Sequence, residues 1–582
     1  MLNRLLFIAA AFVVAVALAF STRTASIHKA SAEAQQIFSK RTSLIGCSPD
    51  WNLIGEALEE MDIPPIPGAG NYQWKISTNS DSAQFYFNQG INTYYSFHII
   101  ESMASFRKAK RFDPNSAIIH WAEALAYGPN INDYGYVASP EALEAVTLAQ
   151  QYAVNASPFE KALISAMSVR YSADSSDLNR QILNQRYTAE MKKLYEQFPK
   201  NADAATLYAD AMMLEHPWDL WFPDGRPKDW TPAIRTLLEK TLAIAPMNPG
   251  ANHYYIHVME ASPYPEKARA SADRLGKLTP GLSHTIHMPS HIYLRTGNYE
   301  AGVAVNIEAV KKYRSSIPLF EAVQNNDFLY IIHNLHMQAN NAMMAGRYAI
   351  AKSSADSLVS SIKPEYMQMT GPLGNLIQYI SMTPVLMDIK FGKWNDLLAY
   401  PQPASNLVYG NVIWHFGKGM AWAGTGELEK AKAALNSMRT LMKDSGLYIP
   451  YSPFSPAIDG AAVAEHLLAG TILLKEGNMK AARADLEKAV SIEERMVYNE
   501  PRDWLLSPSP YLGNCLLKMG MPAEAKKAFE KDLGNNRENG WSLFGMMQAA
   551  RSEKNTVQWK ELEKRFSKAF SLSDIKLSAS VY

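Results

Sequence analysis

The sequence predicts an all-α protein of the solenoid class, in which pairs of antiparallel helices stack into a right-handed superhelix. Three observations lead to this prediction. From about residue 81 onward, Ala- and Leu-rich stretches of helical length alternate with short breaks at Gly, Asn or Pro. No convincing run alternates between apolar and polar residues, as a half-buried strand would. A short motif recurs at the breaks and divides the helices into repeated pairs.

Composition narrows the classes of protein that this chain can represent. Its 582 residues are 47% hydrophobic and 19% charged, which is typical of a folded globular chain. Lys and Arg number 57 and Asp and Glu 56, so a net charge of +1 gives no reason to expect nucleic-acid binding. Two cysteines exclude a disulfide scaffold and any multi-cysteine metal site. Metal ligands must therefore come from His, carboxylates or Met.

The N-terminus has the features of an export signal. The 16 residues from Leu5 to Phe20 carry no charge and follow a short basic start. This stretch is too short to span a membrane comfortably and has the length of a signal-peptide core, and Ala17-Leu18-Ala19 supplies a small-x-small cleavage pattern. We therefore predict that residues 1–19 are a signal peptide and that the protein is periplasmic or secreted. An uncleaved N-terminal anchor is the alternative, and it is the one membrane contact we expect.

The rest of the chain divides into three parts. Residues 20–80 are expected to be a polar leader and linker, because Pro and Gly interrupt them around Ile63-Pro64-Pro65-Ile66-Pro67-Gly68. Residues 81–550 are assigned to the solenoid, with a His-rich centre at 253–336. Residues 551–582 are polar but hold Leu562 and Phe566, which is typical of a helix that caps a repeat array and of a short tail after it.

A six-residue motif, Gly-x-large-x-x-small, marks the turn inside each predicted helix pair. Gly ends one helix with a positive φ, the large residue packs in the turn, and the small residue lets the next helix approach closely. This is the pattern of tetratricopeptide (TPR) repeats, although the copies are 43 to 80 residues apart rather than the roughly 34 of a regular array. The array is therefore irregular, with longer helices, insertions or a further repeat in its widest gap. The motif begins at Gly297, Gly346, Gly426, Gly477 and Gly520.

Histidine is concentrated in residues 253–336, which hold seven of the 13 in the chain. The spacings are helical: two pairs are four residues apart and one pair is three apart, so the members of each pair project from one helix face. Glu260 lies near the first pair along the same face. Pro289 suits the first turn of a helix and would leave two of the His in the segment before it. The seven are His253, His257, His284, His287, His291, His333 and His336.

This clustering predicts a transition-metal site. In a stacked array equivalent helices stand side by side, so the histidine pairs of three helices can converge on one concave face. Imidazole suits Zn, Cu, Fe and Ni, and thioethers from Met288 and Met337, each in a His-x-x-His-Met sequence, would shift the preference towards copper. We therefore predict that the seven His bind a transition metal, with copper preferred over zinc or iron. Glu260 is expected to be a further ligand or a catalytic proton acceptor.

Two functions follow from such a cluster. A site with more ligands than a structural zinc needs can keep an open position for metal-dependent catalysis, either a redox reaction or a hydrolysis. The alternative is a non-catalytic scaffold, in which the same His line a groove that binds a peptide or protein partner. With either function, Trp218, Tyr254 and Tyr293 are candidates for an aromatic wall of the groove, facing a small molecule or a peptide.

Several sequence blocks occur in an informative order. They are His120-Trp121-Ala122-Glu123, Gly128-Pro129-Asn130-Ile131-Asn132, Pro217-Trp218-Asp219-Leu220-Trp221, Asp224-Gly225-Arg226-Pro227, Asn248–His257, His287–Tyr293 and Asn539–Gly545. In these blocks the chain resembles a large group of exported bacterial TPR-repeat proteins that share a His-rich HYYIH and HMPSHIY motif pair. The resemblance covers roughly residues 81–550 and implies the fold and export, but no reaction. Members usually carry Phe-Asn-His ahead of a Glu, whereas this chain has Phe97-His98-Ile99-Ile100-Glu101, so that His is shifted or lost.

Overall fold

The computed structural model describes residues 61–133, 136, 139–172, 179–326 and 328–582, together with Pro49, Trp51 and Leu58. The predicted signal peptide at 1–19 and most of the first part of the predicted leader lie outside the described residues. The chain forms two compact units. The first runs up to Phe198 and includes Arg314–Asn326, and the second comprises Pro199–Tyr313 and Asp327–Tyr582.

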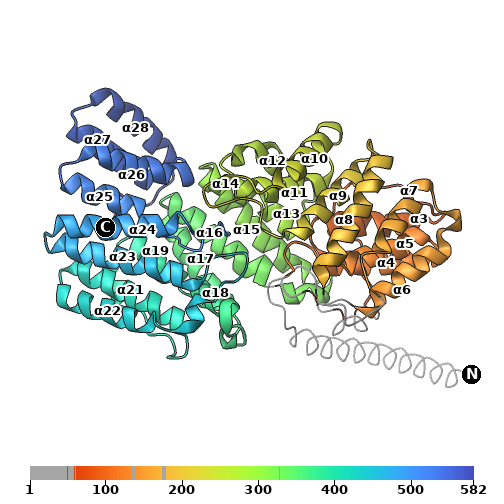
Figure 1. The fold of residues 1–582 in the computed structure, drawn as a ribbon, viewed down its shortest axis with the longest axis horizontal. Coiled ribbons are helices and arrows are strands. Elements are labelled where there is room, and N and C mark those ends of the chain that lie inside the picture. The colour runs from red at the N-terminus through yellow and green to blue at the C-terminus, as the bar shows by residue number, and fades with distance from the viewer. Residues whose placement is uncertain are drawn as a thin grey trace, which may run out of the picture. The chain divides into compact units, whose positions relative to one another are not determined.

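The first unit is helical. Helix α3 packs along α4, and α5 packs along α6 (Figure 1). Helix α4 ends at Phe112, directly before Asp113-Pro114, because Pro cannot continue the helical hydrogen bonding. Its elements are α3 (Asp81–Tyr95), α4 (Ile99–Phe112), α5 (Ala117–Ala126), α6 (Pro140–Tyr152), η1 (Ala153–Asn155), α7 (Pro158–Met167), α8 (Arg180–Gln197) and η3 (Glu321–Asn326).

The end of the predicted leader is part of this unit, which corrects the expectation that residues 20–80 lie outside the core. Ile63, Trp74 and Ile76 are almost fully buried. The ring of Trp74 lies 5.8 Å from that of Phe87 and 5.7 Å from that of Trp121, between centroids. The Pro and Gly residues of this segment prevent a helix but do not prevent its apolar side chains from being buried in an extended chain.

The second unit begins with helices that carry most of the His-rich region. They are α9 (Ala202–Glu215), α10 (Thr231–Ile244), α11 (Pro249–Glu260), η2 (Pro265–Ala268), α12 (Arg269–Leu278), α13 (Ser283–His287), α14 (Pro289–Arg295) and α15 (Tyr299–Ser316), whose residues after Tyr313 belong to the first unit. Pro289 is the first residue of α14, as predicted, and it separates this helix from α13.

The rest of the second unit is the more regular part of the array. Its elements are η4 (Phe328–His333), α16 (Asn334–Met344), α17 (Tyr348–Ser361), η5 (Tyr366–Gln368), α18 (Gly371–Ser381), α19 (Thr383–Lys390), α20 (Trp394–Ala399), α21 (Val408–Thr425), α22 (Leu428–Leu441), η6 (Ser445–Tyr448), α23 (Ala457–Lys475), α24 (Met479–Glu493), α25 (Ser509–Lys518), α26 (Pro522–Asn535), α27 (Gly540–Ser552) and α28 (Thr556–Ala569). Figure 1 shows the pairs α21–α22, α23–α24, α25–α26 and α27–α28 stacked one on the next.

The repeat motif predicted these turns correctly. All five motif glycines have a positive φ, between 69° and 88°, in the region that other residues enter only with strain. The chain also has such a turn at Gly392, with φ 65°, between α19 and α20. Three short helices, α18 to α20, therefore occupy the widest gap between motif copies. Within the described residues the regular elements are helices, and two isolated β-bridges join Trp221 to Pro227 and Pro450 to Pro456.

One described helix, α23, is long and apolar enough to span a membrane by length and composition, and half of its apolar window is buried. This helix packs against α24, the second helix of the same pair. Its apolar character is accounted for by its place between neighbouring helix pairs.

The second unit closes on itself through contacts between distant repeats. The side chain of Arg295, at the end of α14, donates from Nη1 to the carbonyl oxygen of Asn535 over 2.7 Å. The hydroxyl of Tyr299 donates to the carbonyl oxygen of Arg537, also over 2.7 Å. The indole of Trp541 donates to the carbonyl oxygen of Met343 over 2.9 Å. The turn between α26 and α27 therefore lies against the turns that begin α15 and α17.

The C-terminal tail adds to this closure. Helix α28, in the segment predicted to cap the array, buries Leu562 in an apolar cluster with Leu516, Phe529 and Leu543. Beyond it, the carboxylate of Asp574 accepts from the backbone N–H groups of Tyr348, at 2.6 Å, and Ala349, at 2.9 Å. A side chain 226 residues away in sequence thus caps the N-terminus of α17.

We predict that Asp574→Ala destabilises the protein by about 1 kcal/mol, because two N–H groups at a helix N-terminus lose a charged acceptor. In calorimetry the melting temperature should fall by about 2 °C. The control is Asp356→Ala, which removes an exposed carboxylate that pairs only with Lys352 within its own helix. Equal melting temperatures for the two variants would contradict the capping role.

Candidate metal centre

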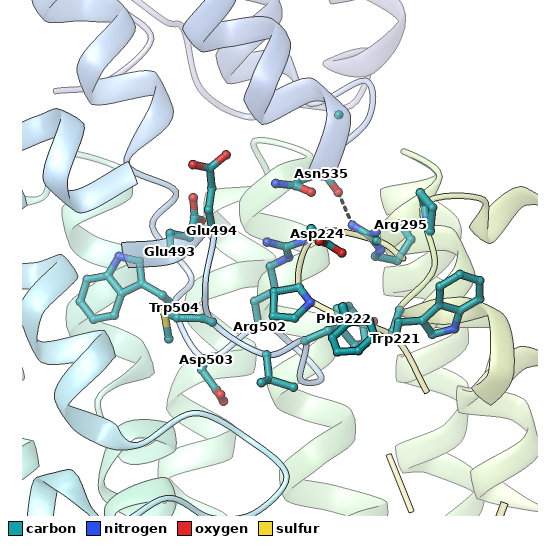
Figure 2. A pocket seen from close by; sticks show the side chains of 18 of the residues that line it. Trp221, Phe222, Asp224, Arg295, Glu493, Glu494, Arg502, Asp503, Trp504 and Asn535 are labelled. Atoms are coloured by element: carbon teal, nitrogen blue, oxygen red, sulfur yellow. Dashed lines mark hydrogen bonds between the residues drawn. The ribbon is translucent and has the colours of Figure 1, made fainter. Parts of the chain in front are cut away.

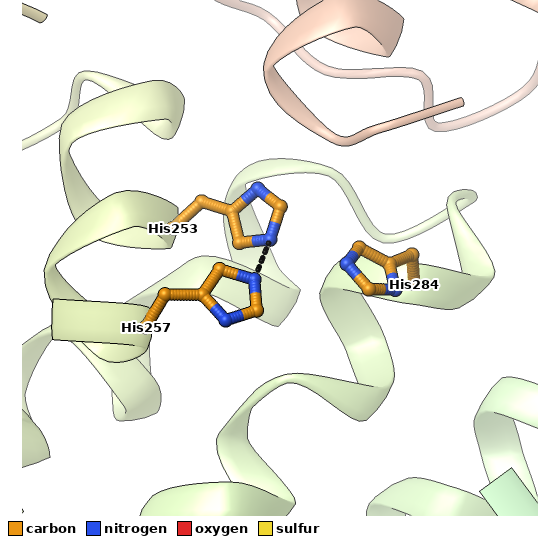
Figure 3. Close-up of side chains that lie close together, drawn as sticks. All are labelled: His253, His257 and His284. Atoms are coloured by element: carbon orange, nitrogen blue, oxygen red, sulfur yellow. Dashed lines mark hydrogen bonds between the residues drawn. The ribbon is translucent and has the colours of Figure 1, made fainter. Parts of the chain in front are cut away.

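Three histidines from α11 and α13 form the first part of the centre. The side chain of Asn248 caps α11 by accepting from Ala251 N–H, and the helix then places His253 and His257 one turn apart. Their Nε2 atoms are 3.1 Å apart. His284 of α13 lies beside them, with its ring centroid 5.0 Å from that of His253 (Figure 3). We call His253, His257 and His284 the first histidine set.

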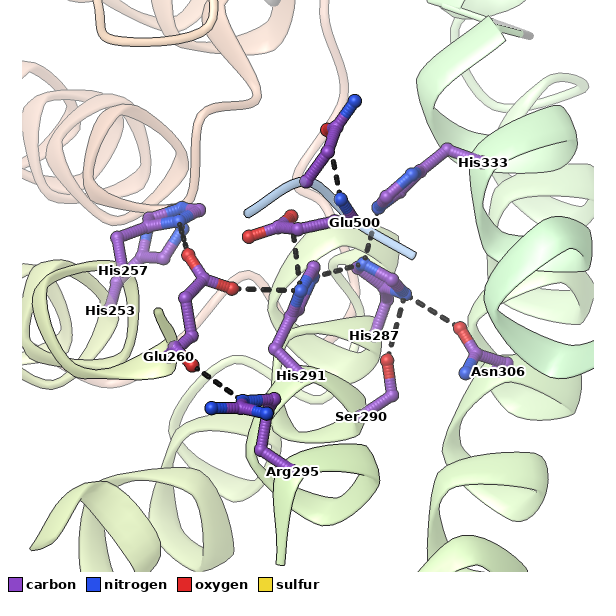
Figure 4. Close-up of polar contacts among 11 residues, drawn as sticks. His253, His257, Glu260, His287, Ser290, His291, Arg295, Asn306, His333 and Glu500 are labelled. Atoms are coloured by element: carbon purple, nitrogen blue, oxygen red, sulfur yellow. Dashed lines mark hydrogen bonds and ion pairs between the residues drawn. The ribbon is translucent and has the colours of Figure 1, made fainter. Parts of the chain in front are cut away.

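A second histidine set, His287, His291 and His333, is tighter. The Nε2 atom of His287 lies 2.7 Å from Nε2 of His291 and 3.0 Å from Nε2 of His333 (Figure 4). In each set one nitrogen per ring can be chosen so that all three lie within 4.8 Å of one another. All six rings are buried or nearly so, and they come from four helical segments.

In three of the six rings, those of His257, His287 and His291, the opposite nitrogen Nδ1 lies next to an acceptor. Asn306 donates its amide N–H to the carbonyl oxygen of Gly302, which leaves its own oxygen 2.6 Å from Nδ1 of His287. Nδ1 of His257 lies 2.9 Å from Oε1 of Glu260. An acceptor at Nδ1 places the hydrogen on that nitrogen and leaves a lone pair on Nε2. This is how metal-binding imidazoles are usually oriented in proteins.

Glu260 connects the two sets. Its Oε1 faces His257 of the first set, and its Oε2 lies 2.9 Å from Nδ1 of His291 in the second. The same Nδ1 atom is 3.0 Å from Oε2 of Glu500. The backbone carbonyl of Glu260 accepts from Nε of Arg295 over 3.1 Å. The residue predicted as a ligand or catalytic base is thus 1% exposed and lies behind the imidazoles, on the side away from their Nε2 atoms.

The electrostatics of the centre favour neutral rings around one positive charge. Burial lowers the pKa of His257, His287 and His333 well below the usual range, and neighbouring imidazoles add to the shift. Burial also opposes the charge on His291, but Glu500 and Glu260 outweigh it and raise the pKa of His291 to about 10. His291 is therefore positively charged at neutral pH in the metal-free protein, and a metal ion bound by the second set would replace the proton on its Nε2 atom.

The two carboxyl groups share one negative charge in the metal-free protein. Burial, together with the charge of Glu500, raises the pKa of Glu260 well above its usual value. Burial acts on Glu500 in the same direction, but the charge of His291 outweighs it and lowers the pKa of that carboxyl group. A second positive charge at the histidines would favour ionisation of Glu260 as well.

The spacing of the Nε2 atoms suits a common ion. Metal–nitrogen bonds of about 2.0–2.1 Å place two ligand nitrogens about 2.9–3.4 Å apart for right-angled to tetrahedral geometry. The separations of 2.7 and 3.0 Å in the second set and 3.1 Å in the first are close to this range. Small rotations of the rings would bring the nitrogens to a bound ion.

His333 reaches the second set through an irregular turn. The π-helical turn η4 ends at His333, and α16 continues from Asn334. Such wide turns often occur at functional sites, because they change the direction in which a side chain points. His336, the predicted partner of His333, lies outside both sets: its ring is 6.1 Å from that of Tyr379, and burial lowers its pKa to about 3. Residues three positions apart in an α-helix point in directions about 60° apart around the helix axis, so His333 and His336 need not face the same site.

The predicted aromatic wall is divided. The ring of Trp218 meets that of His257 edge to face at 5.2 Å, and the buried ring of Tyr254 lies 5.7 Å from that of His253. Tyr293 points elsewhere: its hydroxyl donates to Asp273 over 2.8 Å, and Arg269 lies over its ring. Two of the three aromatic residues therefore border the first set, and Tyr293 packs against α12.

Sequence patterns did not identify two residues of the centre. Glu500 lies in the irregular segment between α24 and α25, with no helical spacing to the histidines. Asn306 lies in α15, where a single Asn has no distinguishing pattern. The signal in the sequence is a polar run between two predicted helices, Tyr498-Asn499-Glu500-Pro501-Arg502-Asp503.

One match to a protein family supports a repeat of this type in part of the chain. The family described as tetratricopeptide repeat matches residues 466–495, in α23 and α24. No curated protein is similar to this chain at a significant level. Among solved structures, the human IFIT1 dimer with m7Gppp-AAAA is 12% identical over 86% of this chain and 92% of its own, with a TM-score of 0.30. Yeast Tom70 is 11% identical over 84% and 93%, with a TM-score of 0.25. The APC/C hetero-tetramer Cut9–Hcn1 is 12% identical over 83% and 90%, with a TM-score of 0.26.

Asn306→Leu should destabilise the protein by about 1–3 kcal/mol, because Nδ1–H of buried His287 loses its acceptor. Asn306→Asp keeps an oxygen at the same place and should cost less. Urea unfolding of the two variants and the parent protein measures the difference. If Leu and Asp are equally destabilising, the contact with His287 does not determine the stability of this site.

Proposed function

We propose that this chain is a TPR-type helical-repeat protein that binds transition-metal ions through its two histidine sets. The observation that carries the proposal is the convergence of three ring nitrogens: Nε2 of His287 lies 2.7 Å from Nε2 of His291 and 3.0 Å from Nε2 of His333. On the other side of the rings, Nδ1 of His287 faces Asn306, and Nδ1 of His291 faces Glu260 and Glu500. Ring nitrogens that face one another while their opposite nitrogens face acceptors form a ligand set.

A purely structural role explains this arrangement less well. A structural His in a core donates from one nitrogen and accepts at the other, and this satisfies both. Here the single lone pair on Nε2 of His287 faces two other ring nitrogens, and it can accept only one hydrogen bond well. A metal ion that displaces the proton on Nε2 of His291 would use the lone pairs of all three rings at once.

The donor set limits which ions fit. Imidazole nitrogens with carboxylates behind them suit Zn, Cu, Fe and Ni. Met337 packs in an apolar cluster with Leu294, Tyr299 and Met344, which is the core-filling role of a methionine. We retain copper as the first choice because Cu(II) binds a given set of nitrogen ligands more tightly than the other divalent first-row metals, with zinc and iron next.

With three imidazole ligands, each set would hold an ion and would leave room for a further ligand. That further position is where a metal centre binds water or a substrate, and it is required for either a redox reaction or a hydrolysis. Glu260, shielded from solvent behind His257 and His291, would hold both rings in position and balance the charge of the ions. We propose this positioning role for Glu260 in place of direct metal binding.

Export of the protein remains our proposal, and it rests on the uncharged segment that begins at Leu5. The second function, a scaffold that binds a peptide or protein partner, is supported by the repeat architecture alone. It requires no metal, so metal content separates the two.

Elemental analysis of untagged full-length protein, expressed with copper, zinc and iron supplied, should find about two metal equivalents per chain, one for each set. His287→Gln should lose about one equivalent and His253→Gln the other. The control is His466→Gln, which removes an isolated His that pairs with Asp485 at 2.9 Å. Circular dichroism and melting curves confirm that each variant is folded.

Less than stoichiometric metal in the parent protein would overturn the metal proposal and leave the scaffold function. Equal metal content in His287→Gln and His466→Gln would show that the metal binds elsewhere. Retention of one equivalent by each of His287→Gln and His253→Gln would support two separate sets.

A further inference from the structure

A cavity of about 520 Å³ lies in the second unit, next to the metal centre but separate from its ring nitrogens. Its walls are the turn around Trp221 and Phe222, the end of α14 at Arg295, the segment between α24 and α25, and the end of α26 (Figure 2). This volume is within the usual range for a small-molecule site. None of the predicted site residues lines it.

Two buried N–H donors in this wall lack acceptors in the described part of the protein. Nε of Arg502 and Nε1 of Trp504 are both inaccessible to solvent and make no hydrogen bond there. Trp504 is 2% exposed. A buried donor without an acceptor is costly, and a guanidinium group without one is more so because it is charged. Both side chains line the cavity, so a small rotation of each would present its unpaired donor to an acceptor group of a ligand there.

A second guanidinium group strengthens the positive potential. Arg295 lines the same cavity, and its donors are occupied by the carbonyl oxygens of Glu260, Ser262 and Asn535. These acceptors are neutral, so they leave its charge uncompensated. Burial and the nearby charge of Arg502 lower the pKa of Arg295 to about 10, at which it is still charged at neutral pH.

The acidic residues of the wall compensate only part of this charge. Glu494 is paired with Lys531 at 2.5 Å, and Asp224 is paired with Arg226 at 2.7 Å. Burial raises the pKa of Glu493 and of Asp503 to about 7, so neither carries a full negative charge at neutral pH.

We propose that this cavity binds a small organic anion through the guanidinium group of Arg502, with a carboxylate or phosphate group accepting from Arg502 and Trp504. A planar guanidinium group binds both head groups through paired, charge-assisted hydrogen bonds. The rings of Trp221 and Phe222 offer an apolar wall for the body of the ligand. This site does not depend on the metal proposal, because none of its donors is a histidine.

The test is calorimetric titration of the full-length protein, after chelator treatment and again after reloading with copper. Three probes share one ring: benzoate, phenyl phosphate and neutral benzamide. We expect at least one of the anions to bind in the millimolar range or tighter, and benzamide to bind at least about tenfold more weakly. The anion that binds more tightly identifies the head group as carboxylate or phosphate.

Arg502→Gln should weaken binding of that anion about tenfold or more, because the charge and the paired donors are lost. The control, Arg439→Gln, removes an exposed arginine that pairs with Glu465 and does not line the cavity, so this variant should bind as the parent does. If Arg502→Gln fails to fold, Arg502→Lys is used in its place. Lysine keeps the positive charge but lacks the paired N–H donors of a guanidinium group, so this variant should bind with intermediate affinity.

Two results would overturn the proposal. One is the absence of binding of either anion up to about 10 mM, which is weaker than a preformed site should allow. The other is an unchanged affinity in Arg502→Gln, or in Arg502→Lys where that variant replaces it. Because both forms of the protein are titrated, either result counts whether or not the metal proposal is correct.

Discussion

The buried carboxyl group of Glu260 is the constraint on which the rest of this centre depends. A carboxyl group that is 1% exposed loses its hydration, and this loss costs several kcal/mol unless other groups compensate. The compensation comes from both histidine sets, because its two oxygens contact Nδ1 of His257 and of His291. Those contacts in turn orient Nε2 of both rings away from the carboxyl group. The position of one side chain thus determines where the ring nitrogens of two helices point.

The closed arrangement of the second unit makes this burial possible. A TPR array of short helix pairs would by itself leave the ends of α11 and α14 at the edge of the stack. Contacts such as Arg295 with Asn535, 240 residues apart, bring the turn after α26 against α14. The segment between α24 and α25 is then enclosed, and it delivers Glu500 to His291, 209 residues earlier in the chain. The charge balance of the centre is therefore a property of the whole unit, because Glu260 comes from the same helix as His257 whereas Glu500 comes from a segment more than 200 residues further along the chain.

Local patterns predicted the parts of this structure that local physics determines. The five motif glycines adopt the expected positive φ because the turn geometry excludes a side chain, and α14 begins at Pro289 because its ring suits only the first helical turn. Glu500 was not predicted because its position depends on how distant repeats come together, and such contacts produce no periodic pattern in the sequence. The helical spacing that predicted the other six histidines also predicted His336, which lies outside both sets. A residue three positions along a helix can point to the side of the face that its partner occupies. Burial of Trp74 was missed because composition alone does not show what an extended segment packs against.

The metal centre and the anion cavity are connected by one short segment. Glu500 faces His291, and Arg502, two residues later, lines the cavity, while Arg295 contacts both through the carbonyl of Glu260 and the cavity wall. A metal ion adds positive charge on one side of this segment, and an anion adds negative charge on the other. Opposite charges at this range in a buried region attract each other, so binding of either ligand should strengthen binding of the other by the same factor. The anion probe should therefore bind more tightly to copper-loaded than to chelator-treated protein. Equal affinities would show that the two sites are not energetically coupled.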